Sequence, residues 1–158
     1  MNNTSFGHNV EFAWLLLHSI DILGLNVEDY KEKIRKIDDH CLAYGIDRKL
    51  GGVFCEGPHD GPARERNKEF WQQAECLVGL LDAVYLFREP KYLDAYENVH
   101  RFVLDVMVNH EVGEWFPLFD EHNHLIWDHM AHAWKINYHT VRSMIQSEKR
   151  LKKLVAAL

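Results

Sequence analysis

The sequence predicts an all-α fold in which long helices form the inner and outer layers of a ring. Apolar residues recur with helical spacing through most of the chain. Helices that are apolar almost all round alternate with helices that carry one apolar stripe. Alternation typical of strands is confined to one short segment. Because a helix that is apolar all round is buried on both sides, the alternation indicates an inner and an outer layer, with one helical hairpin as the repeat.

The two kinds of helix follow one another along the chain. The first is broadly apolar and stops at Gly24. The second is mostly charged, and the third is again broadly apolar. The fourth is amphipathic, and the fifth ends in a basic run that suits a helix C-terminus. The five helices are predicted over residues 8–23, 27–44, 68–87, 91–109 and 136–154.

The segments between these helices predict one long loop and one β-hairpin. Residues 45–67 contain several glycines and prolines and form the loop. Residues 114–119 and 124–127 flank the polar turn 120–123, which is the pattern of a hairpin. The hairpin is either a surface flap or a wall of a binding pocket.

Size and composition exclude several classes of protein. A chain of 158 residues with 47% hydrophobic residues fits one globular domain, 1–158. The net charge of −6 argues against a nucleic-acid partner, and the longest apolar run, residues 12–17, is too short to span a membrane. The start of the chain has no signal-peptide pattern, and three cysteines without CxxC spacing suggest reduced thiols. A cytoplasmic location is therefore expected.

Three pairs of side chains suited to sugar chemistry lie at the starts of the first, third and fifth predicted helices. The members of each pair are three or four residues apart and therefore share one helix face. Such a pair alone is usually a solvated face or a structural contact, but here all three occur at the same end of successive inner helices. Burying polar groups on otherwise apolar helices costs free energy, so their presence there favours a functional role. The pairs are His8 with Glu11, Trp71 with Glu75, and His139 with Arg142.

These residues stand in motifs that resemble a known family. The motifs are Gly7-His8-x-x-Glu11, then Trp71-x-Gln73-Ala74-Glu75, then Trp134-Lys135-x-x-Tyr138-His139-x-x-Arg142. In this order they resemble the C-terminal half of N-acylglucosamine 2-epimerases and cellobiose 2-epimerases, over nearly the whole chain. Asn137 stands where many members have proline. The resemblance implies an all-α fold that is half of an (α/α)6 toroid.

The same resemblance implies a carbohydrate 2-epimerase that acts on a mono- or disaccharide. Its reaction removes the proton at C2 of the open-chain sugar and returns it on the other face through an enediolate. The family's two acid–base histidines match His8 and His139. Free imidazole titrates near pH 6.5, which suits proton exchange at neutral pH.

The remaining motif residues are implied in substrate binding. Glu11 would orient an imidazole or bind a hydroxyl, Trp71 and Glu75 would line the sugar subsite, and Arg142 would polarise sugar oxygens. No cofactor is implied. No metal is expected either, because the histidines at 122, 124, 129 and 132 fit no zinc motif.

Family members are more than twice as long, so the chain looks like a truncated or split epimerase. Two other functions stay open: an aldose–ketose isomerase of the same superfamily, and a catalytically inactive half-barrel or association module. Five helices cannot close a ring, so an N-terminal half or a homodimer is expected to cover its flanks. The apolar residues expected at these flanks are the run 12–17 with Met144, Ile145, Leu151 and Leu154.

Overall fold

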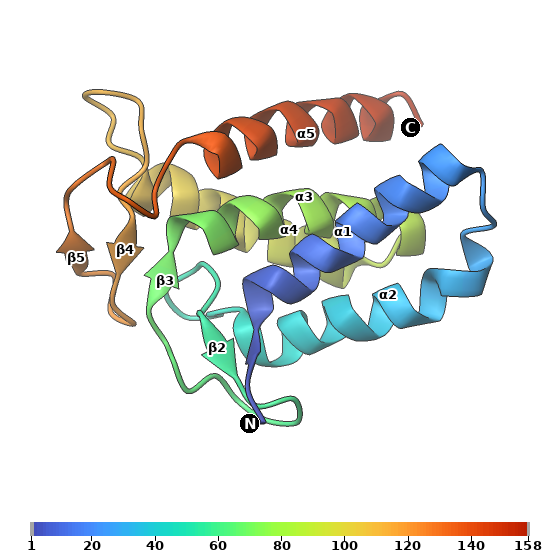
Figure 1. Ribbon diagram of the computed structural model, residues 1–158, viewed down its shortest axis with the longest axis horizontal. Coiled ribbons are helices and arrows are strands. Elements are labelled where there is room, and N and C mark those ends of the chain that lie inside the picture. The colour runs from blue at the N-terminus through green and yellow to red at the C-terminus, as the bar shows by residue number, and fades with distance from the viewer. Residues whose placement is uncertain (1, 158) are drawn as a thin grey trace.

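The computed structural model describes residues 2–157, and within them the chain forms five α-helices (Figure 1). The second and fourth α-helices each continue into one π-helical turn, η1 and η2. All five predicted helices are present, with ends that move by a few residues. Their bounds are α1 Phe6–Leu23, α2 Glu28–His40, η1 Cys41–Gly45, α3 Phe70–Phe87, α4 Pro90–Phe102, η2 Val103–Met107 and α5 Tyr138–Val155.

The helices form two layers. In the inner layer α3 lies between α1 and α5 and packs against both (Figure 1). The outer helix α4 packs against α3, and the outer helix α2 packs against both α1 and α3. The alternation of inner and outer helices along the chain is therefore as the sequence predicts.

Local chemistry explains where α1 begins and ends. The Oγ of Ser5 caps the helix by accepting a hydrogen bond from the backbone N–H of His8. Gly24 ends it with φ of 63°, a left-handed conformation that glycine adopts without a steric cost. The cap places His8 in the first turn of α1, which fixes its position relative to the sheets described next.

Short strands join the loops to the starts of α1 and α3. β1 (Thr4–Ser5) pairs with β2 (Glu56–Gly57) directly before α1, and β3 (Lys68–Glu69) directly precedes α3. β3 pairs with β4 (Leu118–Phe119), which pairs with β5 (Leu125–Trp127), all antiparallel. The predicted hairpin is thus formed by β4 and β5, but its first arm is shorter than expected.

The three inner helices differ in how completely they are buried. α3 is buried on nearly all sides, with Tyr85 as its one exposed residue, because it has another inner helix on each flank. α5, in contrast, buries only Thr140 and Ser143 completely, and α1 exposes Phe12 and Leu15. The expectation that the first, third and fifth helices are buried on two sides is therefore right for α3 and wrong for α1 and α5.

The flanks expose much of the apolar surface that the sequence predicts. Phe12 and Leu15 are exposed on α1, whereas Ala13 and Trp14 in the same run are buried. On α5 the side chain of Ile145 is exposed on the open flank, whereas Met144 and Leu151 are exposed in the groove between α5 and α4. Leu154, in contrast, packs against the core, so it does not belong to the open flank.

Candidate active site

The inner helices all begin at the end of the molecule that carries the three-stranded sheet (Figure 1). The first turns of α1, α3 and α5 therefore bring their polar side chains together. The sheet supplies Glu69, Leu118 and Trp127 beside them, as part of a common cavity. Residues that are far apart in the sequence thus line one site.

Glu75 of α3 is the buried centre of this site. Its Oε1 is 2.6 Å from Nδ1 of His139 and accepts a hydrogen bond of 2.7 Å from Nη2 of Arg142. Its Oε2 accepts a hydrogen bond of 2.9 Å from Nε1 of Trp14. Both carboxylate oxygens are therefore occupied by groups from the two flanking helices.

These contacts keep Glu75 ionised despite its burial. Burial alone raises the pKa of a carboxyl group, but the hydrogen bonds from His139, Arg142 and Trp14 outweigh it and hold the pKa of Glu75 below its usual value. An ionised carboxylate can only accept hydrogen bonds, so Nδ1 of His139 carries the proton. In the neutral imidazole, Nε2 is then the nitrogen with a free lone pair.

Arg142 joins the two carboxylates of the site. Its Nη2 donates to Oε1 of both Glu11 and Glu75. Its guanidinium also lies over the rings of Trp14 and Tyr138, at 5.1 and 4.9 Å from their centroids. Possible ligand atoms of Glu11, Glu75 and His139 lie within 4.8 Å of one another, a grouping that could hold a metal ion. The guanidinium of Arg142 already supplies positive charge to the carboxylates of Glu11 and Glu75, two of the three residues in this grouping.

The two candidate acid–base residues share one aromatic neighbour. The ring centroid of Trp71 is 4.5 Å from that of His8 and 5.7 Å from that of His139. His139 also contacts the ring of Tyr138, with 3.9 Å between centroids. Because both imidazoles pack on the same indole, they lie at the same level of α1 and α5.

A cavity of about 300 Å³ opens at these rings. This volume is at the lower end of the range for small-molecule sites. Aromatic rings dominate its walls, and such rings can stack on the apolar faces of a sugar. The cavity is lined by His8, Glu11, Glu69, Phe70, Trp71, Pro117, Leu118, Trp127, His132, Trp134, Tyr138 and His139.

Two buried lysines hold the loops that form the wall. Nζ of Lys68 donates to Oδ2 of Asp47, the carbonyl of Gly51 and Oδ1 of Asn123, at 2.7 to 2.8 Å. This network ties the long loop to the turn of the hairpin. Burial lowers the pKa of Lys68, although Asp47 opposes the shift. The wall beside the cavity is therefore fixed by buried charge.

Lys135 plays the same part for the segment before α5. It is 1% exposed, and its Nζ donates to Oε1 of Glu114 at 3.0 Å and to the carbonyl of Met130 at 2.8 Å. The adjoining Trp134 is 89% exposed and lines the cavity. Lys135 thus anchors the segment that presents this indole.

The structure brings the six predicted site residues together in pairings that differ from the expected ones. Glu11 binds Arg142 rather than an imidazole, and Glu75 is too deeply buried to line the cavity. The sequence interpretation missed Trp14, which lies three residues after Glu11. Its i,i+3 spacing was the available signal. It also missed the aromatic residues Trp127, Trp134 and Tyr138 at the cavity.

Comparison with known families decides the assignment. The family described as N-acylglucosamine 2-epimerase (GlcNAc 2-epimerase) matches residues 3–143, which is most of the chain. The chain belongs to the N-acylglucosamine 2-epimerase family. The match includes His8, Glu75 and Arg142 and thus spans the residues of the site.

Individual members of this family are similar to the chain over most of its length. A cellobiose 2-epimerase from Ruminococcus albus is 26% identical over 153 residues, which cover 90% of this chain and 36% of the relative. A crystal structure of D-mannose isomerase has a TM-score of 0.84 and 27% identity, over 92% of this chain and 37% of that one. The structure of cellobiose 2-epimerase from Spirochaeta thermophila has a TM-score of 0.75 and 30% identity, over 97% and 39%.

The fold is half of the (α/α)6 toroid of these epimerases. The chain spans a little over a third of the length of the relatives that it matches. Its inner layer of three helices and outer layer of two form an open arc of that ring. In the described part of the chain, no helix is both long and apolar enough to cross a membrane.

Proposed function

We propose that this chain carries the catalytic histidines of a carbohydrate 2-epimerase, in which His8 and His139 exchange the proton at C2 of an open-chain aldose. Membership of a family of carbohydrate epimerases and isomerases supports the reaction class. The observation that carries the proposal is the shared packing of both imidazoles on Trp71, at the mouth of a cavity lined by aromatic rings.

The proposed reaction uses one histidine as base and the other as acid. The base removes the C2 proton, and the electron pair of the C–H bond forms a C1–C2 double bond while the carbonyl oxygen becomes an enediolate oxygen. The second histidine then gives its proton to C2 on the opposite face, and the carbonyl re-forms. Each transfer needs the imidazole nitrogen roughly 3 to 3.5 Å from C2.

Glu75 and Arg142 prepare His139 for this role. The ionised Glu75 accepts a hydrogen bond from Nδ1–H of His139, which leaves Nε2 as the basic nitrogen of the imidazole. Arg142 fixes that carboxylate by bonding the same oxygen. Glu11, Trp71, Glu75 and Arg142 thus form the substrate-binding and supporting residues of the proposed site, and a mono- or disaccharide is the proposed substrate.

An aldose–ketose isomerase is the second candidate, because a D-mannose isomerase from Marinomonas mediterranea is 27% identical over 92% of this chain. The two reactions share the enediolate. In an isomerase the proton is delivered to C1, and the product is a ketose. The products of the reaction therefore separate the two candidates.

Solvent exchange measures the proposed step directly. The protein is incubated with cellobiose or D-mannose in deuterated buffer, and NMR follows the label at C1 and C2. An epimerase gives label at C2 and the C2 epimer, whereas an isomerase gives label at C1 and the ketose. His8→Ala and His139→Ala are each expected to lower the rate by at least about 100-fold.

His59→Ala is the matched control, because this histidine is exposed on the loop 45–67 and does not line the cavity. Its rate is expected to equal that of the unmodified protein. Full activity in both site variants would disprove the two-histidine mechanism, and absence of exchange in the unmodified protein would contradict epimerase activity of the chain itself.

A further inference from the structure

The inner layer of the half-toroid has two open edges, one along α1 and one along α5. Because α3 separates these helices, each has a face that points away from α3. On α1 this face carries a stripe with helical spacing, His8, Phe12, Leu15, Ser19 and Ile22, all of which are exposed. The most exposed apolar members of this stripe are Phe12 at 58% and Ile22 at 70%.

The edge of α5 carries a stripe of similar length. Tyr138, Val141, Ile145 and Lys152 follow one another at helical spacing, and all four are exposed. The opposite face of α5 packs on α3, where Ser143 donates a hydrogen bond to the carbonyl of Ala74. The two stripes are therefore faces that the chain itself leaves uncovered.

We propose that a second copy of this chain covers both edges and closes the ring. A two-fold rotation about the toroid axis places α1 of each copy beside α5 of the other, so both joints form at once. The inner helices begin at the same end of the molecule (Figure 1), so this rotation keeps them parallel. Three inner helices from each copy supply the six of the complete toroid. Two-fold association is also the commonest form of self-assembly.

The α1 stripe and the α5 stripe lie at matching heights along the toroid axis. His8 and His139 contact the same ring of Trp71 and are therefore level. Helices rise by about 1.5 Å per residue, so residues an equal distance further along α1 and α5 are also level. Leu15 is seven residues after His8 and Ile145 is six residues after His139, so their levels differ by only about 1.5 Å. These two apolar side chains are expected to meet across each joint.

The second copy also completes the active-site cavity. His8 is exposed at the open edge, and in the closed ring Tyr138 of the second copy would approach it. The lumen opposite Trp71 would then have a wall, which an open arc lacks. The oligomeric state is measured without any assay of catalysis, so this proposal can fail separately from the proposed function.

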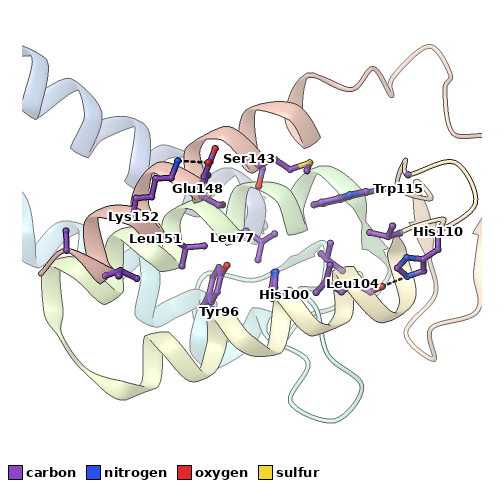
Figure 2. Close-up of a pocket in the computed structure, with 17 residues that line it drawn as sticks. Leu77, Tyr96, His100, Leu104, His110, Trp115, Ser143, Glu148, Leu151 and Lys152 are labelled. Atoms are coloured by element: carbon purple, nitrogen blue, oxygen red, sulfur yellow. Dashed lines mark hydrogen bonds and ion pairs between the residues drawn. The ribbon is translucent and has the colours of Figure 1, made fainter. Parts of the chain in front are cut away.

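A second and larger cavity provides an internal control. It has a volume of about 790 Å³ and lies between α3, α4 and α5, and of the two stripes only Lys152 lines it. Figure 2 shows Leu77, Tyr96 and Leu151 around it. Leu151 is 40% exposed and Ile145 is 47% exposed on the same helix. Substitutions at these two positions therefore distinguish the edge of α5 from its groove.

Light scattering coupled to size exclusion tests the proposal at tens of micromolar protein. The unmodified chain is expected at twice its mass of 18.6 kDa. Leu15→Lys and Ile145→Glu should each weaken the dimer by at least about tenfold, because each change occurs in both joints. Leu151→Glu should leave it unchanged. The double variant Leu15→Lys/Ile145→Glu should restore the dimer, because each joint then pairs opposite charges.

Circular dichroism of each variant verifies that the helices remain folded, which is expected because the substituted side chains are exposed. A monomeric unmodified chain would overturn the proposal. So would a dimer that Leu151→Glu breaks and Ile145→Glu does not. Failure of the double variant to recover, with both single variants folded and monomeric, would show that Leu15 and Ile145 do not face each other and would refute the proposed joint.

Discussion

At the scale of single residues, the site depends on how one buried carboxylate is held. Glu75 receives hydrogen bonds from a residue of α1 and from two residues of α5. The pKa of Glu75 stays below its usual value because these donors outweigh the effect of burial. The charge of Glu75 therefore depends on the packing of both neighbouring helices.

Trp14→Phe tests this dependence. The substitution keeps an aromatic ring in the core but removes the donor to Oε2 of Glu75, and a buried acceptor left without a partner costs about 1 to 3 kcal/mol of unfolding free energy. Chemical denaturation measures the loss. Trp71→Phe is the control, because it removes a donor to the partly exposed Glu69 and should cost less. Equal losses in the two variants would contradict the special role of Trp14.

Asp38 is a second buried carboxyl group, and it has no comparable donors. It is 1% exposed, and its Oδ1 has no hydrogen-bond partner. Burial, with a smaller contribution from Asp82, raises its pKa well above the ordinary value of 3.8. The folded state therefore retains a proton that the unfolded state releases. The contribution of this proton on Asp38 to the free energy of unfolding is complete below pH 3.8 and decreases as the pH rises towards the folded-state pKa of Asp38.

Asp38→Asn should remove the loss of stability that occurs as the pH rises, since the asparagine amide resembles the neutral acid and does not ionise. The unfolding free energy at pH 7 is expected to rise by about 1 to 2 kcal/mol, with little change near pH 3.5. Denaturation at several pH values measures both. Asp39→Asn on the same helix should give no gain, because Asp39 is paired with Lys91 and Tyr92. An Asp38→Asn variant with unchanged pH dependence would contradict the raised pKa.

At the scale of secondary-structure elements, α1 and α3 approach each other closely at Gly79. A methyl group on Gly79 would lie 2.2 Å from Cγ1 of Val10 and 3.2 Å from its carbonyl oxygen. Both residues are buried. The absence of a side chain on Gly79 thus sets the distance between these helices, and with it the position of His8 relative to Trp71.

Gly79→Ala is therefore expected to lower the unfolding free energy by about 1 to 3 kcal/mol through overpacking, even though alanine favours a helix. Thermal and chemical denaturation measure the change. In the double variant Val10→Ala/Gly79→Ala the contacting methyl is gone, so the cost should be smaller than the sum of the two single changes. Strict additivity would show that the two positions do not compete for space.

At the scale of the whole molecule, stability should be uneven across the half-toroid. α3 is enclosed by α1, α4 and α5, whereas α5 packs extensively only against α3 and buries two residues completely. Opening α5 exposes less apolar surface than opening α3, so it requires less free energy. The last turns of α5 are expected to open most readily.

Amide hydrogen exchange measures this distribution. The slowest amides should lie in α3 and the fastest helical ones in the second half of α5. In the Ile145→Glu variant α5 should exchange faster than in the unmodified chain, while α3 changes little. Protection of α5 equal to that of α3 in this variant would show that the open flank is sealed within a single chain.

The sequence by itself determines the helices, the hairpin and the three motif pairs, because helical periodicity and i,i+3 or i,i+4 spacing are local properties. The partners of the charged groups are not local. Glu75 pairs with His139 across 64 residues, and Arg142 reaches Glu11 across 131. Only the packing of α1 and α5 on the two sides of α3 decides those pairings. It also decides that α3 is buried far more completely than α1 and α5, because burial depends on which neighbours are present in space.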